Sequence, residues 1–184
     1  MQRAQRATLR LAGMTFTREM LKLARRMRGG IPLTVGSGPI QMNGAYADID
    51  LEIWQFHHNF PRSVDDIQQS LDEARLLQDT TGRPVWISEW QRIRDRSGWR
   101  GERMPADQLG PDLSSLAPLV AESGIGSFFW SLMIKPAYLS GQRAAGTFNG
   151  LFHEDGAVYS LADARAVSGN TALQLPQRPE WPDW

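Results

Sequence analysis

Four short apolar segments alternate with helical patterns along this sequence, and polar or aromatic residues follow several of those segments. We predict strands at Ile31–Val35, Leu51–Phe56, Pro84–Ser88 and Ile125–Trp130. These segments lack a regular alternation of apolar and polar residues, which is typical of strands whose two faces are both covered. Strands that alternate with helices favour a parallel sheet with crossover helices. The sequence therefore predicts an α/β fold.

Helical spacing and capping residues predict the intervening helices. Ser63 with Asp66, and Ser160 with Asp163, form capping-box patterns, and Gly82 is expected to end the first of these helices. A third helix is predicted around Leu116, Leu119 and Val120, started or kinked near Pro118.

The first predicted helix runs from Thr17 to Gly29. Thr17 is its expected N-cap and Phe16 is expected to pack on Leu21. Its expected buried stripe is Met20, Leu23, Ala24 and Met27. The basic residues of this region alternate with apolar ones, which we interpret as a solvated helix face: Arg10, Arg18, Lys22, Arg25 and Arg26.

Two stretches fit the alternation less well. The 15 residues between Val35 and Leu51 show no convincing helix. The end of the chain is rich in proline from Gln174 onward, which indicates an extended or loose tail. We therefore predict one domain over residues 1–170 and a tail over 171–184.

Charge and composition exclude several classes of function. The net charge is zero, although the first 30 residues carry eight Lys or Arg and only one acid, Glu19. That basic stretch holds a single Phe, which is poor material for stacking on bases, so we expect no nucleic-acid partner. No apolar run approaches the roughly 20 residues that a bilayer requires. No export signal follows Met1, and the compartment stays open.

Glu89 is the most conspicuous candidate for chemistry. It directly follows the apolar segment Pro84–Ser88, and the last residue of a parallel strand points into the mouth of a barrel. The alternative is a structural carboxylate that pairs with Arg92 or Arg94.

Four segments together resemble the C-terminal half of clan A glycoside hydrolases, which include the family 5 cellulases. The similar segments, in chain order, are Phe56-His57-His58-Asn59, Pro84-Val-Trp-Ile-Ser-Glu-Trp90, Gly124-Ile-Gly-Ser-Phe-Phe-Trp130 and Asn149 to Ser160. The resemblance implies strands five to eight of a (β/α)₈ TIM barrel, which as a whole needs about 250 residues. It also implies that Glu89 is the nucleophile of a retaining O-glycosidase that cleaves β-linked glycans.

The resemblance assigns further residues to sugar binding. His57 and Asn59 are expected to border the reacting sugar, Trp130 to form the floor of its subsite, and Trp99 to contact an outer sugar. Simpler roles are a hydrogen-bonded histidine for His57 and core packing for Trp130. Adjacent strand residues point to opposite faces, so His57 and His58 are not expected to share a metal. We expect no metal and no cofactor.

The second carboxyl group of a retaining glycosidase has no counterpart in this sequence. The family carries it after the fourth strand in an Asn-Glu pair, and that dipeptide is absent here. Glu52 and Glu102 are the nearest candidates. We therefore expect the chain alone to be inactive and to associate with itself through open barrel edges. The alternative function is a non-catalytic carbohydrate-binding or interaction protein derived from such a barrel.

Overall fold

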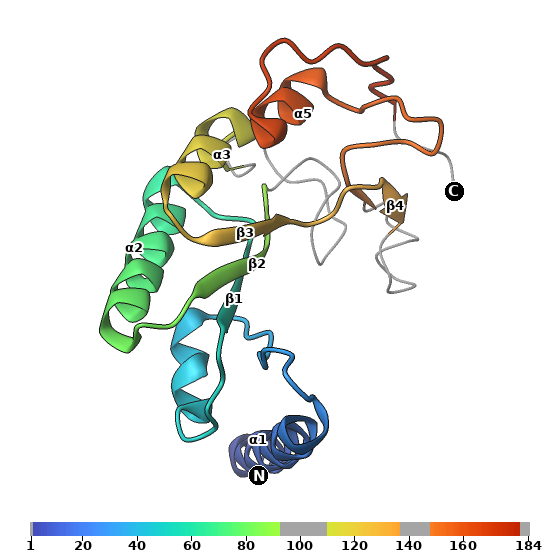
Figure 1. Ribbon diagram of the computed structural model, residues 1–184. Coiled ribbons are helices and arrows are strands. Elements are labelled where there is room, and N and C mark those ends of the chain that lie inside the picture. The colour runs from blue at the N-terminus through green and yellow to red at the C-terminus, as the bar shows by residue number, and fades with distance from the viewer. Residues whose placement is uncertain (1, 93–109, 137–147, 181–184) are drawn as a thin grey trace.

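A parallel three-stranded sheet is the centre of the structure, a computed structural model that describes residues 2–92, 110–136 and 148–180. The strands β1 (Trp54–Asn59), β2 (Val85–Gln91) and β3 (Gly126–Phe129) lie in the order β1-β2-β3. Helix α2 (Val64–Thr81) connects β1 to β2, and α3 (Leu113–Glu122) precedes β3. Figure 1 shows α2 and α3 on the same side of the sheet, with α5 (Leu161–Ser168) beyond α3. This is the strand–helix alternation that the sequence predicts.

The main core lies between the sheet and these helices. β1 and β2 contribute every second side chain to it, such as Phe56 and Ile87, which are both fully buried. The helices supply the opposite wall with Ile67, Leu71, Ala74, Leu113, Leu116 and Val120. The described residues place no such cover on the other face of the sheet, where Phe128 of β3 is 52% exposed. The sheet is thus covered by helices on one face, as the wall of a barrel is.

The capping residues predicted for two helices do cap them. Ser63 Oγ accepts a hydrogen bond from the Asp66 amide at 3.1 Å, and α2 ends at Gly82 with a left-handed backbone. Ser160 Oγ accepts one from the Asp163 amide at 3.1 Å at the start of α5. These bonds satisfy amide groups that the first turn of a helix otherwise leaves unpaired.

The predicted strand at residues 31–35 is wrong: this segment is extended but forms no ladder. The Leu33 carbonyl accepts hydrogen bonds from the amides of Glu52 (3.0 Å) and Ile53 (3.4 Å). The Leu33 amide, however, donates to the Glu52 side chain at 2.8 Å. Pro32 has no amide hydrogen to continue the pairing, and Ile31 is exposed. The sheet therefore has three strands where the sequence predicts four.

A short helix, η1 (Ile40–Tyr46), occupies the link in which the sequence shows no helical pattern. It is a 3₁₀ helix, held against β1 by Asn43, whose side-chain amide donates to the carbonyls of Ile40 (2.8 Å) and Gln55 (2.9 Å). A 3₁₀ helix of two turns carries no 3.6-residue repeat, so its sequence gives no periodic signal.

Helix α1 (Gln2–Met27) corrects the prediction in its start and in its orientation. Thr17 lies inside the helix and donates to the Gly13 carbonyl at 3.0 Å, so it is no N-cap. Phe16, Met20, Leu23 and Met27 are exposed, whereas Leu21 packs in a second core cluster with Leu33, Tyr46, Ile49 and Leu51. The basic side faces the protein instead: Arg18, Arg25 and Arg28 form ion pairs with Asp48, Asp50 and Glu52.

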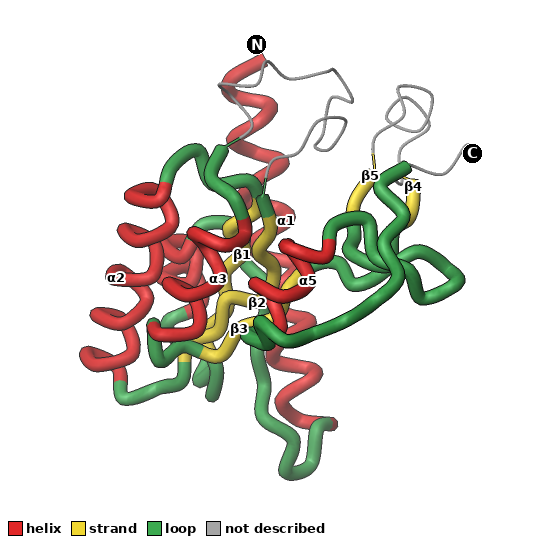
Figure 2. The backbone as a smooth tube through the Cα atoms, turned by 90° about the horizontal axis from the view of Figure 1, so that it is seen from above, coloured by secondary structure: helices red, strands yellow, loops and turns green. Residues whose placement is uncertain are grey.

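The end of the chain packs on the segment before α5. The Val158 amide donates to the Pro176 carbonyl at 2.8 Å, and the Arg178 amide donates to the Val158 carbonyl at 2.9 Å. Arg178 also pairs with Glu154 and Asp155, both at 3.1 Å. Nearby, β4 (Lys135–Pro136) and β5 (Phe148–Asn149) form an antiparallel pair, seen beside this segment in Figure 2. The described part of the tail is therefore extended and hydrogen-bonded.

None of the helices in the part of the chain that the structure describes is both long enough and apolar enough to cross a membrane.

The packing of α2 on the sheet predicts very different costs for two leucines on this helix. Leu71 is fully buried, whereas Leu76 is 68% exposed. Leu71→Ala should lower the free energy of unfolding by about 2–5 kcal/mol, because it removes buried methyl groups and leaves a cavity. Leu76→Ala, the matched control, should change it by less than about 0.5 kcal/mol. Urea denaturation followed by circular dichroism measures both. Equal losses would contradict the packing described here.

Candidate functional site

A bulge in β2 determines which way Glu89 points. Phe56 of β1 pairs with Ile87, but the next residue, His57, pairs with Glu89, so β2 has one extra residue at Ser88. The pairing with β3 shows the same surplus, because it passes from Ile87↔Ser127 to Trp90↔Phe129. Ser88 Oγ donates a hydrogen bond to the Phe56 carbonyl at 3.2 Å.

Without the bulge, Glu89 would follow Val85 and Ile87 on the face that the helices cover. The extra residue reverses the alternation, so that Trp90 returns to the helix side, where it is buried, and Glu89 shares a face with His57. The predicted strand ends at Ser88, whereas β2 continues to Gln91. The carboxylate nevertheless lies near the carboxyl end of a parallel strand, on the uncovered face.

Two residues of β1 lie next to the Glu89 carboxylate. The Asn59 side-chain amide donates a hydrogen bond to Glu89 Oε2 at 2.8 Å. His57 Nδ1 lies 3.6 Å from the same oxygen, slightly too far for a hydrogen bond. The side chains of His57 and Glu89 both keep about a third of their surface exposed. The structure therefore brings together three residues that the sequence singled out, and both neighbours approach one carboxylate oxygen.

Local backbone contacts hold His57 in place. Its amide donates to the carbonyls of Ser37 and Gly38, both at 2.9 Å. Gly36 lies against the ring: a Cβ atom there would be 3.2 Å from His57 Nε2. The three residues that follow the extended segment 31–35 thus support His57.

A cavity of about 790 Å³ surrounds the carboxyl end of β1 and contains Glu89. Its walls come from the loop at Gly38–Gln41, from β1 itself, and from the start of α2. This volume lies within the range of about 300–1,000 Å³ that is typical of ligand sites. Its described lining includes the carboxylate, amide and imidazole groups of Glu89, Asn59 and His57, and also His58, Arg62 and Asp66 on the side of α2.

His58 points away from Glu89, toward α2, as the sequence predicts for adjacent strand residues. Its Nδ1 lies 2.8 Å from Ser70 Oγ, and its Nε2 lies 3.6 Å from Asp66 Oδ2. Burial lowers the pKa of His58, and the nearby Asp66 carboxylate opposes this effect only in part. The two histidines therefore cannot bind one metal. Across the described residues, no group of three or more His, Asp or Glu is arranged to hold one.

The arginines proposed as ion-pair partners of Glu89, and the glutamates proposed as the second carboxyl group, lie away from Glu89 or outside the described residues. Arg92 pairs with Asp112 at 2.7 Å and lies 3.7 Å from Asp163, on the side of α3 and α5.

Glu52 precedes β1 and binds Arg28 and the Leu33 amide. Glu52 lies before the start of β1, whereas Glu89 pairs with His57 near the carboxyl end of that strand, so the two carboxylates are at opposite ends of β1. Glu52 is thus no candidate for the second carboxyl group. Arg94, Trp99 and Glu102 fall in a stretch that is not described.

Aromatic residues continue the uncovered face on the other side of Glu89. Trp130 directly follows β3, and its amide donates to the Trp90 carbonyl at 3.2 Å. Trp130 is therefore one strand away from Glu89, on the opposite side from His57. Phe129 packs on Trp90 on the helix side, with 5.2 Å between ring centroids. Phe128 instead contacts Trp86, at 5.5 Å. Phe128 and Phe129 therefore lie on opposite faces of the sheet.

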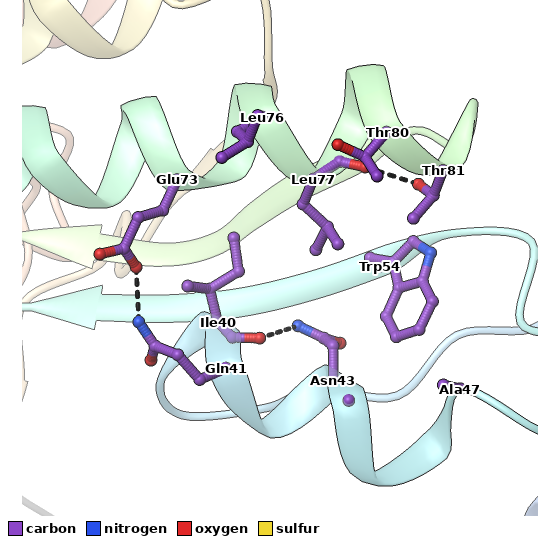
Figure 3. A pocket seen from close by; sticks show the side chains of 11 residues that line it. Ile40, Gln41, Asn43, Ala47, Trp54, Glu73, Leu76, Leu77, Thr80 and Thr81 are labelled. Carbon is purple, nitrogen blue, oxygen red and sulfur yellow. Dashed lines mark hydrogen bonds between the residues drawn. The ribbon is translucent and has the colours of Figure 1, made fainter.

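A second cavity, of about 590 Å³, lies between η1 and α2 and does not reach Glu89. Figure 3 shows Trp54, Leu76 and Leu77 in its walls and Gln41 hydrogen-bonded to Glu73 near one end. Glu73 is the one carboxylate among its described lining residues. This cavity contains neither Glu89 nor its neighbours His57 and Asn59, so we assign the candidate site to the larger one.

Comparison with solved structures identifies the fold. The β-D-glucuronidase of Dictyoglomus thermophilum matches 87% of this chain with a TM-score of 0.59 and 13% identity. β-Glucuronidase 2 of Bacteroides uniformis, covalently bound to cyclophellitol-6-carboxylate aziridine, matches 88% with a TM-score of 0.58 and 12% identity. The β-glucuronidase of Lactobacillus rhamnosus matches 89% with a TM-score of 0.53 and 13% identity.

The chain folds as part of a (β/α)₈ barrel of the kind found in these glycoside hydrolases. It spans 29%, 20% and 30% of the lengths of the three enzymes, so it corresponds to less than a third of each. No protein-family model and no curated protein sequence matches it. At these identities the likeness concerns the fold alone.

The environment of His58 predicts a loss of stability in mild acid. Because burial lowers the pKa of His58 below its usual 6.5, the unfolded chain binds the proton more readily than the folded one. The contribution of His58 is fully present above about pH 6.5 and is lost as the pH falls toward the folded-state pKa. His58→Gln should therefore flatten the pH dependence of unfolding between about pH 7.5 and 5.5. Urea denaturation at both pH values measures this. An unchanged slope in the variant would show that His58 does not contribute.

Proposed function

We propose that this chain is the nucleophile-bearing part of a retaining O-glycoside hydrolase that acts on β-linked glycans. The observation that supports the proposal most directly is the position of Glu89. It lies at the carboxyl end of a barrel strand, on the uncovered face, with Asn59 bonded to one of its oxygens. Active sites of (β/α)₈ barrels lie at this end of the strands.

In the proposed reaction, Glu89 attacks the anomeric carbon of the sugar. The new bond to a carboxylate oxygen forms as the bond to the leaving oxygen breaks, and a protonated carboxyl group gives its proton to that oxygen. The same group then takes a proton from water, and the resulting hydroxide displaces Glu89. Oε2 accepts the hydrogen bond from Asn59, so we assign the attack to Oε1.

In this proposal the proton donor lies outside the described residues. The resemblance to family 5 cellulases places it after the fourth barrel strand, which has no counterpart in this sequence. The sugar class rests on two likenesses, the cellulase-like segments and the β-glucuronidase folds. Glucosides, mannosides and glucuronides are therefore the substrates to test. His57, Asn59 and Trp130 are the proposed contacts of the reacting sugar, and Trp99 that of an outer one.

An activated substrate tests the nucleophile without the missing acid. Dinitrophenolate is a good leaving group and needs no proton, whereas general acid help is worth about 10²–10⁴-fold for ordinary glycosides. We expect 2,4-dinitrophenyl β-glycosides to release a burst of up to one equivalent of dinitrophenolate from this chain, followed by little turnover. Mass spectrometry should find the sugar on the peptide that contains Glu89.

Glu89→Gln should abolish both the burst and the label, because an amide is a poor nucleophile. Glu122→Gln on α3, which changes an exposed carboxylate away from the site, should leave both unchanged. A burst that survives in Glu89→Gln would refute the assignment. Sugar binding without any label on Glu89 would favour the alternative function, a carbohydrate-binding protein that lacks catalysis.

Trp130 provides a second test of the site. If its indole forms the floor of the sugar subsite, Trp130→Ala should weaken the binding of a sugar-like inhibitor by about 1–3 kcal/mol, through the loss of stacking. Calorimetric titration of protein shown to be folded by circular dichroism measures this. Trp86→Ala, which removes another half-buried indole of the same sheet, is the control for a general packing effect. Unchanged affinity in Trp130→Ala would assign Trp130 to packing alone.

A further inference from the structure

Helix α1 presents an apolar stripe that none of the described residues covers. Phe16, Met20, Leu23 and Met27 are 66%, 43%, 39% and 76% exposed. Leu21, on another side of the same helix, is buried against the protein. Figure 1 shows α1 at the edge of the molecule, apart from α2 and α3. Contiguous apolar surface of this kind on a soluble protein marks an interaction site.

The spacing of the stripe is that of a helix-pairing seam. Its members follow one another at intervals of four, three and four residues, the pattern of the a and d positions of a coiled coil. On one side the seam borders the protein itself, because Ala24 packs against the second core cluster. The partner that fits such a seam is another amphipathic helix.

The charges of α1 allow this partner to be a second copy of the same helix. Arg18, Arg25 and Arg28 are neutralised within the chain by Asp48, Asp50 and Glu52. The basic side of α1 therefore adds little repulsion when two copies meet.

The other flank of the seam carries Glu19 and Arg26, seven residues apart and thus at equivalent positions. When two copies run antiparallel, Glu19 of each lies near Arg26 of the other, which gives two opposite-charge contacts. A parallel pair would place Glu19 beside the Ala24 position and leave these charges unmatched. In the single chain Glu19 forms an ion pair with Lys22 at 2.8 Å. This pair is exposed and contributes little to stability, so Glu19 can pair with Arg26 of the partner subunit instead.

We propose that this chain forms a symmetric dimer in which α1 pairs antiparallel with α1 of a second copy. Met20 then packs against Leu23 of the partner subunit, and Phe16 packs against Met27 of the partner subunit. The contact uses the same surface on both copies, so it closes at two subunits and does not propagate. This distinguishes it from association through the open strand edges, which has no such limit. The proposal is independent of the function proposed for Glu89.

Sedimentation velocity over a range of concentrations tests the dimer. Leu23→Glu should raise its dissociation constant by about tenfold or more, because a charge would be buried in the seam. Leu76→Glu, which changes an exposed leucine on α2, should leave the dimer unchanged. A chain that is monomeric at all concentrations would overturn the proposal and leave the stripe to a different protein. Association that Leu23→Glu does not weaken would overturn it in favour of edge pairing.

Charge reversal tests the orientation. Arg26→Glu should weaken the dimer, because each Glu19 would then face a like charge. Glu19→Arg combined with Arg26→Glu should restore it, since the opposite charges are again matched. Failure of the double variant to recover would overturn the antiparallel arrangement. Both positions are on the helix surface, so these variants do not disturb the core.

Disulfide cross-linking gives an independent readout, because the chain has no cysteine of its own. Met20→Cys chains mixed with Leu23→Cys chains should join as unlike pairs under mild oxidation, since these positions oppose each other only in the antiparallel dimer. Preferential joining of like chains would instead indicate a parallel pair and would overturn the proposal.

Discussion

Burial of one face of the sheet determines what the other face can do. Phe56 and Ile87 are packed under α2 and α3, so their strand neighbours must point to the uncovered face. His57 and Asn59 reach that face by simple alternation. The grouping of polar side chains around Glu89 is therefore a by-product of apolar packing on the other side of the sheet.

The sequence predicts much of this arrangement because its signals are local. Serine caps three residues before an aspartate define α2 and α5, and runs of apolar residues define β2 and β3. The extended segment at residues 31–35 shows the limit of such signals. Its apolar residues are typical of a strand, but ladder formation depends on whether backbone groups far along the chain are available. Here the Glu52 side chain accepts the hydrogen bond of the Leu33 amide, which is then not available to a neighbouring strand.

The orientation of α1 could not be derived from its pattern for a related reason. An amphipathic helix usually buries its apolar side, so the basic side was expected in solvent. In the structure, the acidic loop that contains Asp48 and Asp50 attracts the arginines and turns the apolar stripe outward. Periodicity identifies two different faces of a helix, but it does not determine which face packs against the rest of the protein. The β2 bulge was equally hidden, because no residue type marks the extra position.

The extra residue at Ser88 has a consequence for how such a protein can change over generations. An in-frame loss of that single codon would restore regular pairing with both neighbouring strands, so the sheet itself could survive. Glu89 would then directly follow Ile87 and stay opposite His57, on the same face of the sheet as before. A lineage could thus gain or lose this one residue and keep both the scaffold and the polar face of the sheet.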